Sequence, residues 1–286
     1  MNFDRAVFAV ANYDLGATLA SGQAFRWRQG NGGWTGVAGG RWVRLRAGPG
    51  QIAAQTAVSG GDWQWLRHYL QLDVNLAGVL AAFPPEDEAL QEAVRACAGL
   101  RLLRQEPWEC LASFICSSTK QISQIEQIVA LLCRRFGEPL AVPAGEEPAH
   151  SFPGFARLAE VSESDLRGCK LGFRAPYLRG TAQRLAAGEA DLGRLGRLPL
   201  EEARAELLKL PGVGVKIADC VLLFAYGFAE AFPVDVWIQK ALRRHYFPRR
   251  SVSPAQMRRF IGGHFGPQAG YAQQYLFHYM RVKEGK

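Results

Sequence analysis

The chain has 286 residues, of which 34 are Lys or Arg and 26 are Asp or Glu, so its net charge is +8. Hydrophobic residues make up 48% of the chain and charged residues 21%, which supplies material for a sizeable core and excludes global disorder. No apolar stretch approaches the roughly 18 to 20 residues of a membrane span. The first residues, MNFDRAVFAV, lack the basic leader of a signal peptide. We therefore expect an intracellular protein, in cytoplasm, nucleoid or nucleus, with no membrane role.

The composition also bears on partners and cofactors. A positive net charge combined with seven Trp and sixteen Phe suits a polyanionic partner with faces for stacking, which favours nucleic acid. The six cysteines are widely spaced, and they lie at Cys97, Cys110, Cys116, Cys133, Cys169 and Cys220. Such spacing predicts reduced thiols, with neither a closed zinc site nor an iron–sulfur cluster, and hence no cofactor.

Residues 20–57 have the alternating pattern of antiparallel β-strands. Three strands are expected, at Gln23–Arg28 (QAFRWR), Trp34–Val37 and Arg41–Arg46 (RWVRLR). In RWVRLR, Trp42 and the two alternate arginines after it share one face, and Val43 and Leu45 share the other. This predicts a sheet with one covered and one solvated face. We predict that residues 1–100 form a mainly antiparallel β domain with flanking helices.

From about residue 62 the hydrophobic period becomes helical. Helices are expected at Asp62–Leu70, Glu86–Cys97, Pro107–Cys116 and Ile122–Phe136, followed by shorter ones after Pro153. Loop residues fill 141–150, and no internal repeat appears. We predict an all-α domain over residues 101–286, which makes the fold class α+β.

Residues 201–227 predict a helix, a tight hairpin and a second helix. The sequence PGVG at 211–214 cannot continue the first helix, and helical spacing resumes at Val215. Gly212 and Gly214 allow backbone N–H groups to approach a DNA phosphate at the start of the second helix. An ordinary helix–turn–helix corner fits the same pattern.

Lys216 and Asp235 are the candidate catalytic residues. Lys216 lies in the first turn of the second helix, where the helix dipole and a partly apolar setting favour the neutral, nucleophilic amine. Cys220 follows four residues later on the same face. Asp235 stands where a helix over Val236–Tyr246 is expected to begin, so it would cap that helix. A solvated Lys216 and a purely capping Asp235 explain the same spacing.

The sequence LPGVGVKIADC followed by FPVDV resembles the helix–hairpin–helix signature of the base-excision DNA glycosylases, and the hairpin lysine is similar to that of the bifunctional branch. Five further segments resemble the eukaryotic-type 8-oxoguanine DNA glycosylases in the same order, namely residues 19–28, 69–80, 101–118, 170–178 and 269–277. The resemblance covers essentially the whole chain. It implies a monomeric enzyme that excises 8-oxoguanine from duplex DNA and cleaves the strand by β-elimination.

The resemblance implies roles for the two catalytic candidates and for a base pocket. Lys216 would form a Schiff base at the sugar C1′, and Asp235, kept ionised by helix-capping hydrogen bonds, would stabilise the positive charge. Gly22 would accept the N7 hydrogen that distinguishes 8-oxoguanine from guanine. Gln273 and Phe277, four residues apart on one helical face, would meet the base at its Watson–Crick edge and its π-face.

Cys220 would cover the other face of the base under the same resemblance. Taken singly, Cys220 and Phe277 are residue types more often found in a core.

Departures from the family pattern concern the DNA around the lesion. Thr119 stands where an asparagine fills the gap left by the flipped base, and Gln124 replaces an arginine that reads the opposite cytosine. Arg174 corresponds to the second cytosine-reading arginine, and Phe173 replaces a tyrosine wedge. Trp237 replaces a phosphate-contacting histidine. The loss of one arginine predicts relaxed specificity for the opposite base.

The resemblance further implies that hairpin carbonyls, here those of Leu208, Leu210 and Val213, can hold a cation, whereas no side-chain metal ligand is implied. Two alternatives remain at this point. One is a related helix–hairpin–helix glycosylase for alkylated or mismatched bases. The other is a non-catalytic helix–hairpin–helix DNA-binding module, which would need neither Lys216 nor Asp235.

Overall fold

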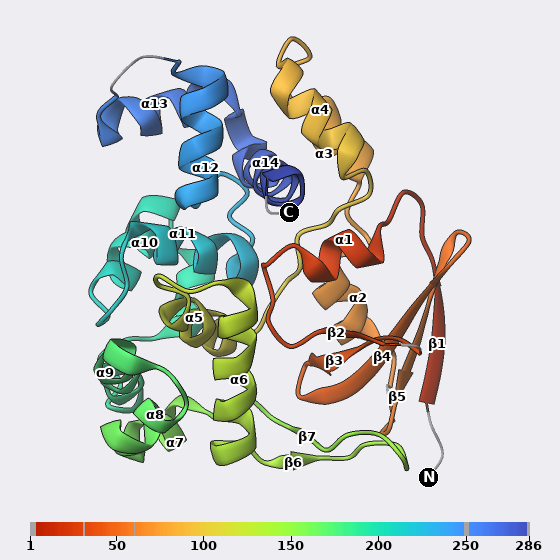
Figure 1. Ribbon diagram of the computed structural model, residues 1–286, viewed down its shortest axis with the longest axis vertical. Helices are drawn as coiled ribbons and strands as arrows, with labels where there is room; N and C mark the ends of the chain where they lie inside the picture. The colour runs from red at the N-terminus through yellow and green to blue at the C-terminus, as the bar shows by residue number, and fades with distance from the viewer. Residues whose placement is uncertain (1–3, 31, 60, 249–251, 285–286) are drawn as a thin grey trace.

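The structure is a computed structural model, and it describes residues 4–30, 32–59, 61–248 and 252–284. A five-stranded antiparallel sheet with short helices comes first in the chain, and a larger array of helices follows it (Figure 1). This arrangement confirms the predicted α+β class. Within these ranges no helix has the length and apolar character needed to cross a membrane.

The sheet has the strand order β1-β5-β4-β3-β2, and every neighbouring pair is antiparallel. Its strands are β1 (Asp4–Ala9), β2 (Arg28–Gly30), β3 (Gly33–Ala38), β4 (Arg41–Gly48) and β5 (Gln51–Thr56). Val43 and Leu45 of β4 are fully buried, as their alternation predicts. They share a core with residues of α1 (Leu15–Ala20) and α2 (Gln64–Leu70).

The strand predicted at Gln23–Arg28 is wrong for most of its length, because only its last residue belongs to β2. Gln23 is fully buried, and its side chain bonds the backbone of the nearby α1 and of the distant segment at residues 101–103. Its Nε2 donates to the carbonyls of Thr18 (2.9 Å) and Arg101 (2.8 Å), and its Oε1 accepts the amide of Leu103 (2.7 Å). These tertiary hydrogen bonds outweigh the strand-like alternation.

The solvated face predicted for the sheet is also only partly exposed. Trp42 shares this face with Arg44, yet it is only 3% exposed. The guanidinium of Arg44 lies 5.3 Å from the centroid of a Trp42 ring and pairs with Glu146. Glu146 belongs to the loop between β6 (Pro139–Leu140) and β7 (Ala149–His150), so a distant segment reaches this face of the sheet.

At the centre of the helical part, α5 (Pro107–Cys116) is buried along almost its whole length. The carboxylate of Glu106 caps it by accepting the amides of Trp108 (3.0 Å) and Glu109 (2.6 Å). The bounds of α5 and of α6 (Ile122–Phe136) confirm the predicted ones. The later helices are α7 (Phe155–Glu160), α8 (Glu163–Gly168), α9 (Ala175–Ala186), α10 (Leu200–Leu208), α11 (Val215–Val221), α12 (Val236–Ala241), α13 (Pro254–His264) and α14 (Ala269–Glu284).

Shorter helical turns complete the chain. There are 3-10 turns at Gly172–Arg174, Leu192–Arg197 and Gly266–Gln268, and π-helical turns at Leu222–Tyr226 and Leu242–Tyr246. The predicted helix over Val236–Tyr246 is therefore α12 continued by a π-helical turn.

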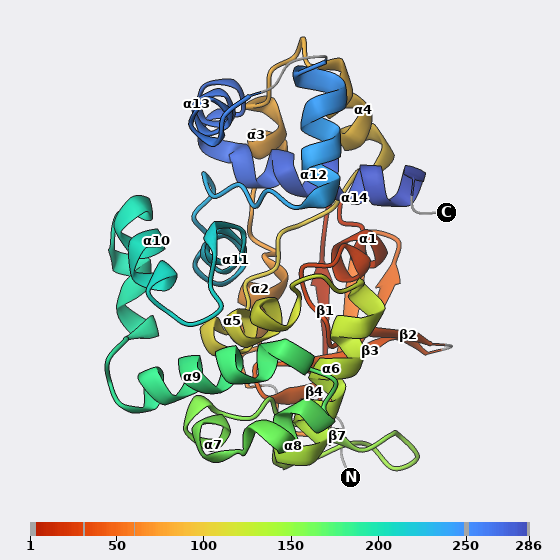
Figure 2. The same ribbon diagram turned by 60° about the vertical axis from the view of Figure 1, so that its left-hand side comes forward.

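Two helices of the first hundred residues lie away from the sheet. In both views α3 (Leu76–Ala81) and α4 (Glu88–Ala96) stand beside α12 and α14 (Figures 1 and 2). Asp87 caps α4 and also accepts hydrogen bonds from Tyr246 (2.8 Å) and His264 (2.7 Å). The domain boundary between residues 100 and 101 stays a prediction.

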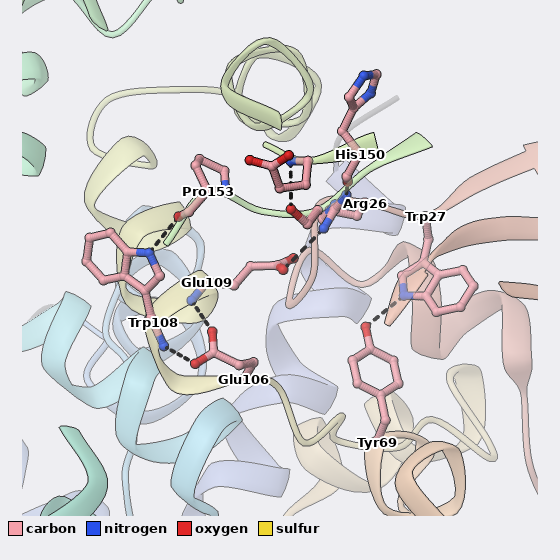
Figure 3. Close-up of polar contacts among 10 residues, drawn as sticks. Arg26, Trp27, Tyr69, Glu106, Trp108, Glu109, His150 and Pro153 are labelled. Atoms are coloured by element: carbon pink, nitrogen blue, oxygen red, sulfur yellow. Dashed lines mark hydrogen bonds and ion pairs between the residues drawn. The ribbon is translucent and has the colours of Figure 1, made fainter. Parts of the chain in front are cut away.

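Polar contacts fix the junction between the sheet and the helical part (Figure 3). Arg26 donates to Oε2 of Glu109 in α5 (3.3 Å) and to the carbonyl of His150. The neighbouring Trp27 donates from Nε1 to the hydroxyl of Tyr69 (2.8 Å). These bonds hold residues 23–27, the irregular segment before β2. They thereby also hold the turn at Gly22, which comes directly before this segment.

Candidate active site

A cavity of about 1140 Å³ lies between the two parts of the molecule. Its walls come from the end of α1, the start of α6, α11, the loop before α12, and α14. Eight residues singled out from the sequence line it, and these are Gly22, Thr119, Lys216, Cys220, Asp235, Trp237, Gln273 and Phe277. The residues Gln124, Phe173, Arg174, Gly212 and Gly214 lie outside its lining. Segments that are distant in the chain thus form one site.

Lys216 lies in the first turn of α11, directly after the hairpin. Its Nζ donates to Oγ of Ser117 (3.2 Å) and lies 5.3 Å from the ring centroid of Phe114. The hydroxyl and the ring therefore hold the amine at the cavity wall and shield part of it from water. Sequence reasoning does not single out Ser117, because a serine beside a helix end is too common to mark a site.

Asp235 caps α12 as predicted, since its Oδ1 accepts the amide of Ile238 (2.8 Å). Burial raises the pKa of this carboxyl, while the bond from Ile238 and the charge of Lys216 act in the opposite direction. Desolvation is the larger of these influences, and the expectation that capping bonds keep the carboxylate ionised stays a prediction. The pKa of Asp235 therefore lies above that of an ordinary aspartate.

The turn at Gly22 has little room for a side chain. Its φ is +77°, in the left-handed region that favours glycine. A Cβ built there would lie 2.5 Å from Cδ1 of Ile122 and 3.0 Å from Nη1 of Arg281. A glycine thus lets α6 and α14 close on this turn. The contact of its carbonyl with a damaged base stays a prediction.

Gln273 and Phe277 project from one face of α14 into the cavity. Gln273 is only 3% exposed, and its Oε1 has no hydrogen-bond partner among the residues that the structure describes. Phe277 is half-buried and packs on the edge of the core. Cys220 is buried, and burial raises the pKa of its thiol to about 12, so it presents a neutral surface.

The hairpin between α10 and α11 is a separate surface. Gly212 has a φ of +76°, and a Cβ there would lie 2.6 Å from Cβ of Tyr177, so the hairpin rests against α9. Gly214 is exposed and forms the N-terminal cap of α11. The carbonyl of Leu210 accepts the amide of Val213 (3.2 Å), and a cation on the hairpin carbonyls stays a prediction. In the described ranges no three His, Cys, Asp or Glu side chains cluster as metal ligands would.

The residues expected to meet the opposite base differ in their accessibility. Phe173 is 54% exposed, as a wedge requires, whereas Arg174 is 3% exposed. Arg174 donates to Oγ1 of Thr119 (2.6 Å) and to the carbonyls of Leu171 (3.1 Å) and Ser118. To read a base, its guanidinium would have to exchange some of these bonds.

Gln124 is exposed and lies in the first turn of α6, where its Oε1 accepts the amide of Gln121 (3.1 Å). Trp237 is half-buried at the cavity wall, and Nζ of Lys240 lies 4.8 Å from a ring centroid of this indole.

Arg281 and Glu126 also line the cavity, and sequence reasoning missed both. Arg281 is one helical turn beyond Phe277, so the four-residue spacing on α14 was a usable signal. Glu126 sits on α6, and only the packing of α6 against the rest of the cavity reveals its position.

Two family models match consecutive parts of the chain. Residues 6–111 match the 8-oxoguanine DNA glycosylase N-terminal domain, and residues 112–264 match the HhH-GPD superfamily of base excision DNA repair proteins. The hairpin and the cavity beside it define a helix–hairpin–helix base-excision repair protein. The chain belongs to the HhH-GPD superfamily and, within it, to the members that carry the 8-oxoguanine DNA glycosylase N-terminal domain.

Relatives extend over nearly the whole chain. The N-glycosylase/DNA lyase OGG1 of Arabidopsis thaliana is 33% identical over 92% of this chain and 76% of that protein. The probable N-glycosylase/DNA lyase of Methanothermobacter thermautotrophicus is 32% identical over 95% of both. The 8-oxoguanine glycosylase/lyase of Clostridium acetobutylicum, solved with duplex DNA containing cytosine opposite 8-oxoguanine, is 30% identical, with a TM-score of 0.88 over 99% of this chain and 100% of that one.

Proposed function

We propose that the protein is a bifunctional DNA glycosylase that excises 8-oxoguanine from duplex DNA and cleaves the strand at the resulting site. The observation that carries this proposal is the meeting of Lys216, Asp235, Gly22, Gln273 and Phe277 in one cavity. The names of the relatives support both activities, glycosylase and lyase. A non-catalytic DNA-binding module would have no need of an amine and a carboxylate facing one cavity.

The proposed chemistry assigns one step to each catalytic group. The neutral amine of Lys216 attacks the sugar C1′ as the bond from C1′ to the base nitrogen breaks, and the base departs with the bonding electrons. The carboxylate of Asp235 stabilises the positive charge that develops on the sugar. A proton passes to the ring oxygen as the bond from C1′ to that oxygen breaks, which gives a protonated Schiff base. The Schiff base accepts the electron pair of the C2′–H bond when that proton is removed, and the 3′ phosphate then leaves with the electrons of its C–O bond by β-elimination.

The proposed base pocket combines one backbone and two side-chain contacts. The carbonyl of Gly22 accepts N7–H of 8-oxoguanine, which guanine lacks. The unpaired Oε1 of Gln273 supplies an acceptor for the N–H groups of the Watson–Crick edge. Phe277 supplies a stacking surface worth about 1 to 3 kcal/mol per base in other base–aromatic contacts.

Borohydride trapping on a duplex with one 8-oxoguanine tests this proposal. We expect the wild-type protein to form a covalent adduct and cleave the strand. Lys216→Gln should abolish both while retaining lesion binding, because the fold does not depend on that ammonium. An adduct with Lys216→Gln at the wild-type rate would contradict the assigned nucleophile. Salt-sensitive binding without any wild-type adduct would indicate the non-catalytic module.

We further propose relaxed discrimination of the base opposite the lesion. An arginine at position 124 would offer donors only, whereas the amide of Gln124 can donate or accept. Gln124→Arg should therefore raise the preference for cytosine, by about 10- to 100-fold for a good base contact. Excision from four duplexes, each with a different base opposite 8-oxoguanine, measures this. Equal preference in both proteins would reject the role of Gln124.

We infer finally that the enzyme acts as a monomer without a cofactor, inside the cell where double-stranded DNA is kept. The net charge of +8 supports contact with a polyanion.

A further inference from the structure

Three cavity-lining side chains, Gln273, Phe277 and Arg281, follow one another on α14 at intervals of four residues. This spacing places them along one face of the helix. The guanidinium carbon of Arg281 lies 5.8 Å from the ring centroid of Phe277. The arginine thus stands beside the aromatic surface on which the proposed function places the damaged base.

The guanidinium of Arg281 is held in place but only partly satisfied. Its Nη2 donates to the carbonyl of Ala20 at the end of α1. Its Nη1 is shielded from solvent and, within the described part of the chain, has no hydrogen-bond partner. This nitrogen lies against Gly22, where a Cβ would come within 3.0 Å of it.

Glu126 of α6 also lines the cavity, and it is the acid whose charge acts on Arg281. Burial raises the pKa of Glu126, while the charges of Arg28 and Arg281 oppose this shift. Burial likewise lowers the pKa of Arg281, and Glu126 opposes that. The guanidinium of Arg281, with its unused donor Nη1, therefore lies next to Gly22 in the cavity wall.

A shielded N–H without an acceptor is unfavourable, so an acceptor at this place would be bound with high selectivity. In 8-oxoguanine the oxygen on C8 is adjacent to N7–H. A base that donates N7–H to the Gly22 carbonyl therefore brings this oxygen to the same end of the cavity as Arg281. Guanine carries only a hydrogen on C8 and offers no acceptor there.

We propose that Arg281 is a specificity-determining residue that donates a hydrogen bond from Nη1 to the oxygen on C8 of the lesion. The inference rests on the proposed function and adds a second point at which the oxidised base differs from guanine. Gly22 would read the added hydrogen on N7, and Arg281 would read the added oxygen on C8.

The test compares two lesions in matched duplexes. 8-Thioguanine keeps N7–H but replaces the oxygen with sulfur, a weaker acceptor. Arg281→Met retains an unbranched side chain and removes the donors. We expect Arg281→Met to slow single-turnover excision of 8-oxoguanine by about 10- to 100-fold, the range for a hydrogen bond to a charged group. The same variant should slow excision of 8-thioguanine by no more than about threefold, by the same reasoning.

Lys283→Met is the matched control, because Lys283 lies on the same helix, pairs with Glu92 (3.1 Å) and does not line the cavity. It should leave both rates unchanged. If wild-type protein excises no 8-oxoguanine, the proposed function itself fails. If wild-type protein is active but Arg281→Met slows both lesions equally, or neither, the assignment of Arg281 is overturned.

A melting curve shows whether Arg281→Met folds. If Arg281→Met does not fold, Arg281→Lys provides the same comparison. The lysine ammonium can still donate to the Ala20 carbonyl, but the variant lacks the planar pair of guanidinium donors. A loss confined to 8-oxoguanine supports the assignment, and an equal loss on both lesions overturns it.

Discussion

At the scale of single residues, Asp235 shows two opposing influences on one carboxyl. Burial raises its pKa, whereas the amide of Ile238 and the charge of Lys216 favour the ionised form. Because the folded-state pKa lies above the unfolded one, folding favours the protonated acid. The stability that this group contributes is full below the unfolded pKa and is lost as pH rises through the folded pKa.

Asp235→Asn should separate catalysis from stability. Asparagine caps a helix as well as aspartate does, and it carries no buried charge, so we expect a denaturation midpoint at neutral pH equal to or above that of wild type. Excision should fall by about 100- to 1000-fold, as when one group that stabilises the transition state is removed. Single-turnover rates and melting curves from acid to neutral pH measure both.

The wild-type rate should fall as pH drops through the raised pKa of Asp235, and the residual rate of the Asn variant should lack that acid limb. A variant that excises at the wild-type rate, or that shows the same acid limb, would remove Asp235 from the chemistry.

At the scale of elements, local sequence predicts a helix well where its ends carry their own signals. Glu106 and Pro107 mark the start of α5, and the capping bonds that Glu106 accepts come from its neighbours in the chain. The segment Gln23–Trp27 fails as a strand because Gln23 bonds the backbone of Arg101 and Leu103, which lie 78 and 80 positions away. The cavity was predictable only through family resemblance, and Arg281 escaped even that.

An ion pair between α10 and α11 supports the helix that carries Lys216. Nε of Arg204 lies 2.7 Å from Oδ1 of Asp219, and both side chains are nearly buried, at 13% and 8% exposed. Burial raises the pKa of Asp219, and Arg204 opposes this. Loss of the arginine would leave a buried carboxyl without its cation.

Arg204→Met should therefore lower the free energy of unfolding by about 3 to 5 kcal/mol at neutral pH. The deficit should shrink as pH falls, because Asp219 then becomes protonated in the folded and the unfolded protein alike. Arg167→Met is the control, since the Arg167–Glu163 pair is 50% and 42% exposed and is worth at most about 1 kcal/mol. Urea unfolding at two pH values distinguishes the two variants. Equal unfolding midpoints for Arg204→Met and Arg167→Met would contradict a structural role for the buried pair.

At the scale of the whole molecule, the site depends on how the sheet and the helical part are joined. The segment after Gly22 is anchored to α5 and β7 by Arg26, which is only 10% exposed in its side chain. Burial raises the pKa of its partner Glu109, and the charge of Arg26 opposes that shift. Residues from both sides of this junction line the cavity.

Arg26→Met should loosen the turn at Gly22 without touching the catalytic groups. A displacement of about 1 Å at a recognition site can slow a reaction by about 100-fold, so we expect excision of 8-oxoguanine to fall by 10- to 100-fold. Affinity for undamaged duplex should change by less than about twofold, because phosphate contacts depend on the hairpin and on net charge. Single-turnover excision and salt-dependent binding measure the two effects.

Arg28→Met removes the same charge only two residues away. Its pair with Glu147 spans 3.8 Å, and the side chains are 70% and 91% exposed, so the pair contributes little. The charge of Arg28 acts on Glu126 in the cavity lining, but its side chain forms no anchoring contact among the described residues, so this control should slow excision less than Arg26→Met does. If Arg26→Met and Arg28→Met slow excision equally, the loss of a positive charge explains the effect, and the contacts of Arg26 with Glu109 and His150 do not. If Arg26→Met leaves excision unchanged, the junction does not position Gly22, and the bonds of Arg281 and Gln274 to the carbonyls of Ala20 and Ser21 suffice to hold the turn.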